Sequence, residues 1–120
     1  MAIFRQGDVI KVPFPYPDRP TRQSRPVLVV SSGGIEDAHG LLWVVMITSA
    51  ENKGWPGDVP VHNLAAAGLP VPSVIRTAKL ATIEASHATK LGRVPAALFR
   101  KVAMRLGQEL GLGSPIGSWR

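Results

Sequence analysis

The sequence predicts a mainly β domain, a small and partly open β-barrel with one α-helix at its C-terminal end. Short apolar runs rich in β-branched residues are separated by turns, and the chain has 12 glycines and 11 prolines among 120 residues. Only the segment near the C-terminus has apolar side chains at helical spacing. These observations favour about five to seven short strands and one packed helix over a helical bundle.

Three strands are predicted in the first half of the chain. Asp8–Phe14 is a short run that prolines end, because proline cannot continue a hydrogen-bonded ladder. A polar and basic loop, Pro15–Ser24, leads to the β-branched run Arg25–Ser32, which a glycine pair closes. Leu41–Thr48 is apolar throughout, which predicts a strand covered on both faces with Trp43 in the core.

The second half of the chain begins with a polar loop, Ser49–Gly57, and the short run Asp58–Val61. Asn63–Leu69 is long enough for one or two helical turns, which a glycine and a proline stop. Two further strands are predicted at Ser73–Leu80 and Thr89–Val94.

A helix of about four turns is predicted after Pro95, since proline favours the first position of a helix. An apolar stripe repeats every four residues, and Gly111 follows its end; the stripe consists of Leu98, Val102, Leu106 and Leu110. We therefore expect one domain over residues 1–110 and a loose tail over residues 111–120.

Several classes of site and location are disfavoured by composition. The chain has no cysteine, which excludes disulfides, zinc–thiolate sites and a cysteine nucleophile. The three histidines lack metal-ligand spacing, so neither a metal site nor a cofactor is expected. The longest apolar run, Leu41–Ile47, is too short to span a membrane, and the first residues do not form a secretory signal. We expect a soluble, cytoplasmic protein with no membrane contact.

The charge distribution points to an anionic partner. The net charge is +6, and all of this excess lies in residues 70–120, where eight basic residues face Glu84 and Glu109. Such an imbalance attracts phosphate backbones or an acidic protein, although it also fits a merely soluble basic surface.

Three stretches carry a resemblance to a known family. GDVIKVPFP, followed after a loop by RQSRPVLVVSS, resembles the first two strands of the PemK/MazF-type toxins of type II toxin–antitoxin modules. WVVMITSAENKGWPGDVPV resembles the third strand, the next loop and the fourth strand of that family. AAGLPVPSVIRTAKLATIEASHATKLGRVP and the helix after it resemble the remainder, so the match runs from about Gly7 to Leu110.

This resemblance implies an SH3-like barrel of the kind found in PemK, MazF and CcdB toxins, assembled as a homodimer. It also implies a metal-independent, sequence-selective endoribonuclease that cleaves single-stranded mRNA through attack by the 2′-hydroxyl of the substrate. The implied protein partner is an acidic antitoxin that occupies the RNA groove.

The resemblance also indicates catalytic candidates. Arg25 matches the arginine of the family's R-P motif, and its guanidinium can hold two phosphate oxygens. Thr48 matches the hydroxyl residue that follows the apolar strand, and Arg76 matches an arginine that precedes an aspartate by two residues in some members. Here Ala78 stands in place of that aspartate. The general base therefore stays open, because an arginine remains protonated and neither His39 nor His62 lies on a family motif.

RNA-binding candidates lie in the two polar loops. Basic side chains there can bind phosphates, and aromatic rings can stack on unpaired bases. Trp55 could equally cover the barrel or a dimer interface. These candidates are Tyr16, Arg19 and Arg22 in the first loop, and Ser49, Lys53 and Trp55 in the second.

Two binding functions are alternatives to the nuclease on the same fold. One is a member that has lost catalysis and only binds nucleic acid or antitoxin, for which Ala78 is the best support. The other is a toxin that poisons DNA gyrase, as the related CcdB-type toxins do.

Overall fold

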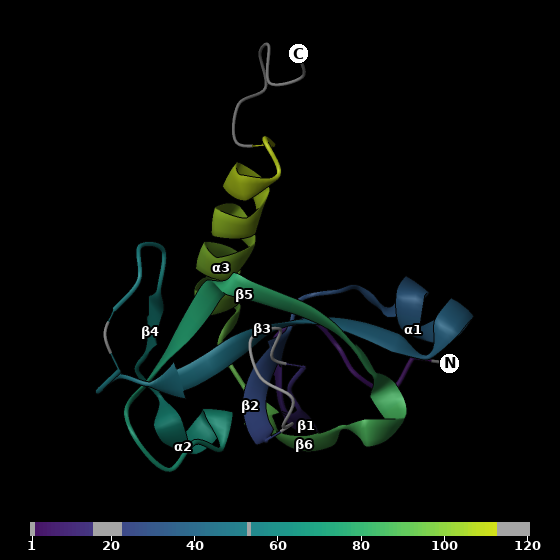
Figure 1. Ribbon diagram of the computed structural model, residues 1–120, viewed down its shortest axis with the longest axis horizontal. Helices are drawn as coiled ribbons and strands as arrows, with labels where there is room; N and C mark the ends of the chain where they lie inside the picture. The colour runs from purple at the N-terminus through teal and green to yellow at the C-terminus, as the bar shows by residue number, and fades with distance from the viewer. Residues whose placement is uncertain (1, 16–22, 53, 113–120) are drawn as a thin grey trace.

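The computed structural model describes residues 2–15, 23–52 and 54–112. One curled, antiparallel sheet of six strands occupies most of the chain, in the order β4-β5-β3-β2-β1-β6 (Figure 1). The strands are β1 (Asp8–Pro13), β2 (Ser24–Val29), β3 (Leu41–Ser49), β4 (Val59–Val61), β5 (Ser73–Glu84) and β6 (Thr89–Arg93). The helices are α1 (Gly33–His39), α2 (Leu64–Ala67) and α3 (Ala96–Glu109), with a 3₁₀ turn, η1, at Ala85–His87. The predicted mainly β fold with a C-terminal helix is confirmed.

The middle of the sheet is buried on both faces. Alternate residues of β1, β2 and β3 enter two separate apolar clusters, because successive side chains of a strand point to opposite faces. One cluster includes Val45 and Ile47 together with Val102 of α3, and the other includes Val44 and Met46. The expectation that the β3 strand is covered on both faces holds for these four residues.

Trp43 contradicts that expectation, since it is 50% exposed and not in the core. Its side chain lines a groove of about 920 Å³, together with residues of α3 and β5. The reason is the direction of α3, which covers the sheet near its first turns and then extends away from it (Figure 1). A continuous apolar run in the sequence carries no information about where the covering helix leaves the strand.

The predicted C-terminal helix is present, but only its first half is fully packed. Leu98 and Val102 are buried, Leu106 is half-buried and Leu110 is exposed. The predicted apolar stripe is therefore partly uncovered. No helix among the described residues is long and apolar enough to cross a membrane.

Helix α1 was not predicted from the sequence. It begins with two glycines, which are poor helix formers, and ends at Gly40 with a φ of 67°. A tertiary contact stabilises it: the buried carboxylate of Glu36 accepts hydrogen bonds from the backbone N–H groups of Ile3 (2.9 Å) and Phe4 (3.1 Å).

Strand β5 is longer than predicted and irregular. It continues to Glu84, but Val45 of β3 pairs with Leu80 while the next residue, Met46, pairs with Arg76. Three residues of β5, 77–79, therefore lie between two neighbouring pairs, which bends the strand. This bend lies beside the loop that connects β3 to β4.

Candidate functional site

Strand register places the three predicted catalytic side chains on one face of the sheet. Val27 of β2 pairs with Met46 of β3, and Met46 pairs with Arg76 of β5. Paired residues of antiparallel strands share a face, and so do residues two positions apart on one strand. Arg25 lies two positions before Val27 and Thr48 two positions after Met46. Arg25, Thr48 and Arg76 therefore lie on the same face, on three adjoining strands.

Arg25 stands near the start of β2, next to the central apolar residues. It pairs with Val12 of β1 and is half-buried. Its Nη2 donates a hydrogen bond of 3.3 Å to Oε1 of Gln23. Arg25 thus lies at the N-terminal end of β2, beside the buried Val12 of β1.

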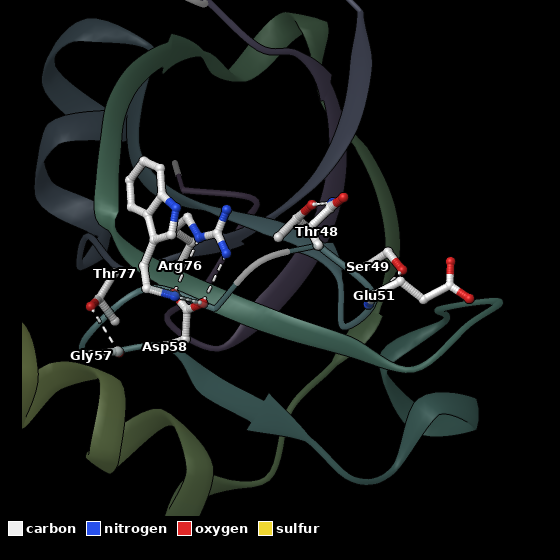
Figure 2. A network of polar contacts seen from close by, with 9 residues as sticks. Thr48, Ser49, Glu51, Gly57, Asp58, Arg76 and Thr77 are labelled. Carbon is white, nitrogen blue, oxygen red and sulfur yellow. Dashed lines mark hydrogen bonds and ion pairs between the residues drawn. The ribbon is translucent and has the colours of Figure 1, made fainter.

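Thr48 is almost fully covered, with 6% of its surface exposed. Nδ2 of Asn52 donates a hydrogen bond of 2.6 Å to Oγ1 of Thr48. The neighbouring Ser49 makes its own contact, in which its Oγ accepts the backbone N–H of Glu51 at 3.2 Å (Figure 2). Sequence reasoning missed Asn52, because an asparagine in a polar loop has no distinguishing pattern until the loop folds back on the strand.

Arg76 forms a two-contact ion pair with Asp58, which lies just before β4. Nε of Arg76 donates to Oδ1 of Asp58 at 3.2 Å, and Nη2 donates to Oδ2 at 2.9 Å (Figure 2). Their side chains are only 8% and 11% exposed, so this pair lies largely away from water. A carboxylate therefore reaches Arg76 from the β3–β4 loop, whereas Ala78 of β5 is exposed.

Trp55 covers this ion pair. Cζ of Arg76 lies 4.4 Å from the centroid of the indole ring, and Nζ of Lys79 lies 5.6 Å from it, both within cation–π range. The backbone N–H of Trp55 also donates to Oδ2 of Asp58 at 2.9 Å. The ring remains 40% exposed, so part of it is available for another contact.

A further hydrogen bond fixes the same loop to β5. Oγ1 of Thr77 donates to the carbonyl oxygen of Gly57 at 3.1 Å (Figure 2). Gly57 has a φ of 89°, in the left-handed region that favours glycine. Both backbone and side-chain atoms of the β3–β4 loop thus form hydrogen bonds with β5.

The other candidates named from the sequence lie elsewhere. His39 ends α1 and His62 follows β4, so neither is on the three strands that carry Arg25, Thr48 and Arg76. Among the described residues, no group of three or more histidine, aspartate or glutamate side chains could hold a metal ion. Four predicted RNA-binding residues lie outside the described residues: Tyr16, Arg19, Arg22 and Lys53.

Residues 5–110 match the family of PemK-like, MazF-like toxins of type II toxin–antitoxin systems. The chain belongs to this family. The resemblance seen in the sequence motifs is confirmed, and the match covers β1 to α3. No curated protein sequence matches the chain.

Solved structures of MazF-like proteins share the fold. MazF from Deinococcus radiodurans superposes with a TM-score of 0.75 at 24% identity, over 92% of this chain and 99% of that protein. An endoribonuclease in complex with its cognate antitoxin, from a mycobacterial species, superposes with a TM-score of 0.71 at 21% identity, over 96% and 100% of the two chains. The Mycobacterium tuberculosis toxin MazF-mt6 gives 0.66 at 24% identity, over 87% and 97%. At these identities the similarity establishes the barrel fold of this toxin.

Proposed function

We propose that this MazF-like toxin is a metal-independent endoribonuclease that cleaves single-stranded mRNA, with the 2′-hydroxyl of the RNA as nucleophile. The observation that supports this most directly is the shared face of Arg25, Thr48 and Arg76 on β2, β3 and β5. The guanidinium of Arg25 and the hydroxyl of Thr48 on this face suit a phosphate that gains negative charge during the reaction, and Arg76 adjoins them.

In the proposed reaction the 2′-oxygen attacks the adjacent phosphorus and the 5′-oxygen of the next nucleotide leaves. The products are a 2′,3′-cyclic phosphate and a new 5′-hydroxyl, so the 2′-proton must be removed and the leaving oxygen must gain one. Arg25 is the group assigned to the charge of the pentacoordinate phosphorus, because its planar guanidinium can donate to two oxygens at once. The hydroxyl of Thr48 is assigned a hydrogen bond to a phosphate oxygen.

Arg76 has a supporting role in this proposal. Its charge is balanced by Asp58 and its guanidinium lies under Trp55, which limits direct contact with a phosphate. We infer that Arg76 holds the β3–β4 loop in place beside Thr48. Asp58 is an acceptor for this arginine, so it is a poor choice for the base that removes the 2′-proton.

RNA recognition is assigned to the loops beside these strands. The exposed part of the Trp55 ring can stack on a base, and each such contact contributes roughly 1–3 kcal/mol to binding. Ser49 lies next to Thr48 at the end of β3, where its hydroxyl can reach the RNA backbone. The basic side chains Arg19, Arg22 and Lys53, and the ring of Tyr16, complete the proposed contacts on the basis of the sequence.

We also propose an acidic antitoxin and a second copy of the chain as protein partners, in the cytoplasm. The net charge of +6 suits an acidic protein that competes with RNA. The homodimer accounts for the uncovered apolar surface, which large exposed side chains mark as an interaction site. The large exposed apolar side chains that line the groove beside α3 are Trp43, Leu80, Leu110 and Leu112.

The test is incubation of purified protein with single-stranded RNA in EDTA, with Arg25→Ala as the comparison. Cleavage by the wild type alone supports the proposal, and mapped 5′-hydroxyl ends identify the cut sites. Equal survival of RNA with both proteins contradicts it. Tight RNA binding without product would instead favour the non-catalytic alternative, for which Ala78 remains the sequence argument. Breakage of DNA in cells whose transcripts stay intact would favour gyrase as the target.

A further inference from the structure

The hydroxyl oxygen of Thr48 accepts a hydrogen bond from Asn52, which lies in the turn that follows β3. Nδ2 of Asn52 lies 2.6 Å from Oγ1 of Thr48. An asparagine amide nitrogen can only donate a hydrogen bond, so the threonine oxygen is the acceptor here. A threonine hydroxyl has a single hydrogen to donate, and this contact directs that hydrogen away from Asn52.

The turn itself does not depend on this side chain. The backbone N–H of Asn52 donates to the carbonyl oxygen of Ser49 at 3.1 Å, and the N–H of Glu51 donates to Oγ of Ser49 at 3.2 Å. These two contacts close the turn through the backbone and through Ser49. The amide of Asn52, on an exposed residue, is thus used for a contact with the buried Thr48 that turn formation does not require.

We propose that Asn52 is a positioning residue that orients the hydroxyl hydrogen of Thr48 toward a phosphate oxygen of the bound RNA. This inference rests on the proposed function, in which Thr48 donates to that phosphate. A hydroxyl whose oxygen already accepts a hydrogen bond loses less rotational freedom when RNA binds, and it is a stronger donor because hydrogen bonds in a chain polarise one another. Asn52 acts only through Thr48, and it need not touch the RNA.

Two substitutions separate this role from a structural one. Asn52→Ala removes the donor, while Asn52→Asp replaces it with a carboxylate that accepts, so the hydroxyl hydrogen of Thr48 turns toward position 52. We expect Asn52→Ala to lower the single-turnover cleavage rate about threefold to tenfold, as for the loss of one hydrogen bond. Asn52→Asp should lower this rate further, by about tenfold to a hundredfold. For Asn52→Ala we expect little change in KM.

The decisive comparison repeats both substitutions in a Thr48→Ala background. If Asn52 acts through the hydroxyl, Asn52→Ala changes the residual rate less than about twofold there, since coupled residues are not additive. Asn52→Asp still adds a negative charge in the Thr48→Ala background. Any change in cleavage rate that it causes there measures the effect of charge alone. Thr48→Ser keeps a hydroxyl and should keep the dependence on Asn52. Glu51→Gln, on the exposed neighbour, is the matched control and should cleave at the wild-type rate.

Equal losses from Asn52→Ala in the wild-type and Thr48→Ala backgrounds would overturn the inference, as would wild-type cleavage by Asn52→Asp. Binding to a fully 2′-O-methylated single-stranded RNA pool, which has no nucleophile, separates this result from the nuclease proposal. If the wild type binds this pool but cleaves no RNA, the nuclease function fails. The positioning role is still supported in that case if Asn52→Asp lowers the affinity for the pool only when Thr48 is present. Additive losses of affinity count against it, and a wild type that neither binds nor cleaves RNA overturns both proposals.

Discussion

The carboxylate of Asp58 meets the guanidinium of Arg76 side-on, with contacts of 3.2 and 2.9 Å between side chains that are 11% and 8% exposed. The two residues come from different elements, β5 and the loop before β4, and are 18 positions apart in the sequence. The same carboxylate accepts the backbone N–H of Trp55. One aspartate therefore ties the loop that carries the aromatic candidate to the strand that carries the third arginine.

Asp58→Ala is expected to lower the free energy of unfolding by roughly 3 kcal/mol. Removing one partner of a buried pair leaves the other charge without its counter-ion in a site poor in water. Urea denaturation at neutral pH measures the change. Glu51→Gln removes an exposed carboxylate of the neighbouring turn and should stay within about 0.5 kcal/mol of the wild type. Wild-type stability of Asp58→Ala would show that the pair does not fix the loop.

Arg25→Ala is expected to reduce kcat/KM for RNA cleavage by at least about a hundredfold, the scale found when one donor to a transition-state oxyanion is removed. The fold should tolerate the change, because Arg25 is half-buried near the start of β2. Arg25→Lys should restore only part of the rate, since an ammonium lacks the paired donors of a guanidinium. Circular dichroism checks the fold and a fluorogenic RNA measures the rate.

The matched control for Arg25 is Arg100→Ala, which removes the same charge from the exposed side of α3. It should retain nearly all of the cleavage rate at physiological salt. An equal loss in the two variants would mean that net positive charge, rather than a placed guanidinium, supports the activity.

Removal of divalent metal is expected to leave cleavage unchanged. The proposed chemistry uses the hydroxyl of the substrate and the protein side chains, and resemblance to the family implies the same independence. The rate of RNA cleavage after dialysis against EDTA, compared with the rate in added Mg²⁺, measures this. A loss of activity that Mg²⁺ restores would contradict the proposed mechanism.

Most of the fold could be predicted because local patterns match the final structure. The β-branched runs became β2 and β3, and the four-residue spacing of Leu98 and Val102 became the buried side of α3. Helix α1 could not be predicted, since contacts of Glu36 with the N-terminal backbone stabilise a segment that starts with two glycines. Trp43 was placed wrongly because its exposure depends on the direction of a helix distant in sequence.

The candidate site could be proposed from the sequence only where residues match family motifs. Arg25 and Thr48 were named as candidates because they match family motifs, and the strand register places them on one face. Asp58 and Asn52 could not be found in the same way, because their partners are fixed only when the β3–β4 loop folds back on β5 and β3. Resemblance to the family implied a carboxylate two residues after Arg76, where this sequence has Ala78, whereas the structure brings a carboxylate to Arg76 from position 58.

A homodimer is expected in solution, and Leu80→Asp should weaken it about a hundredfold or more. Leu80 is 55% exposed on the groove beside α3, and burying a charge in an apolar interface is costly. Sedimentation velocity over a range of micromolar concentrations measures the equilibrium. Val71→Asp places the same charge on a similarly exposed residue that does not line this groove, and it should leave the dimer intact. A wild type that is monomeric throughout this range would contradict the dimer.

Gly57→Ala should both destabilise the protein and weaken RNA binding, because the loop that carries Trp55 needs a glycine there. Its φ is 89°, and an added Cβ would lie 2.6 Å from Nε of Arg105 and 3.1 Å from Oγ1 of Thr77. The left-handed backbone costs an alanine about 1–2 kcal/mol, and the arginine must also move. Gly54→Ala is the matched control, since an added Cβ there meets nothing within 4 Å. Urea denaturation and fluorescence anisotropy with labelled RNA should therefore show a loss for Gly57→Ala and wild-type values for Gly54→Ala. Equal RNA affinity in the two variants would mean that the conformation held by Gly57 does not place the indole for binding.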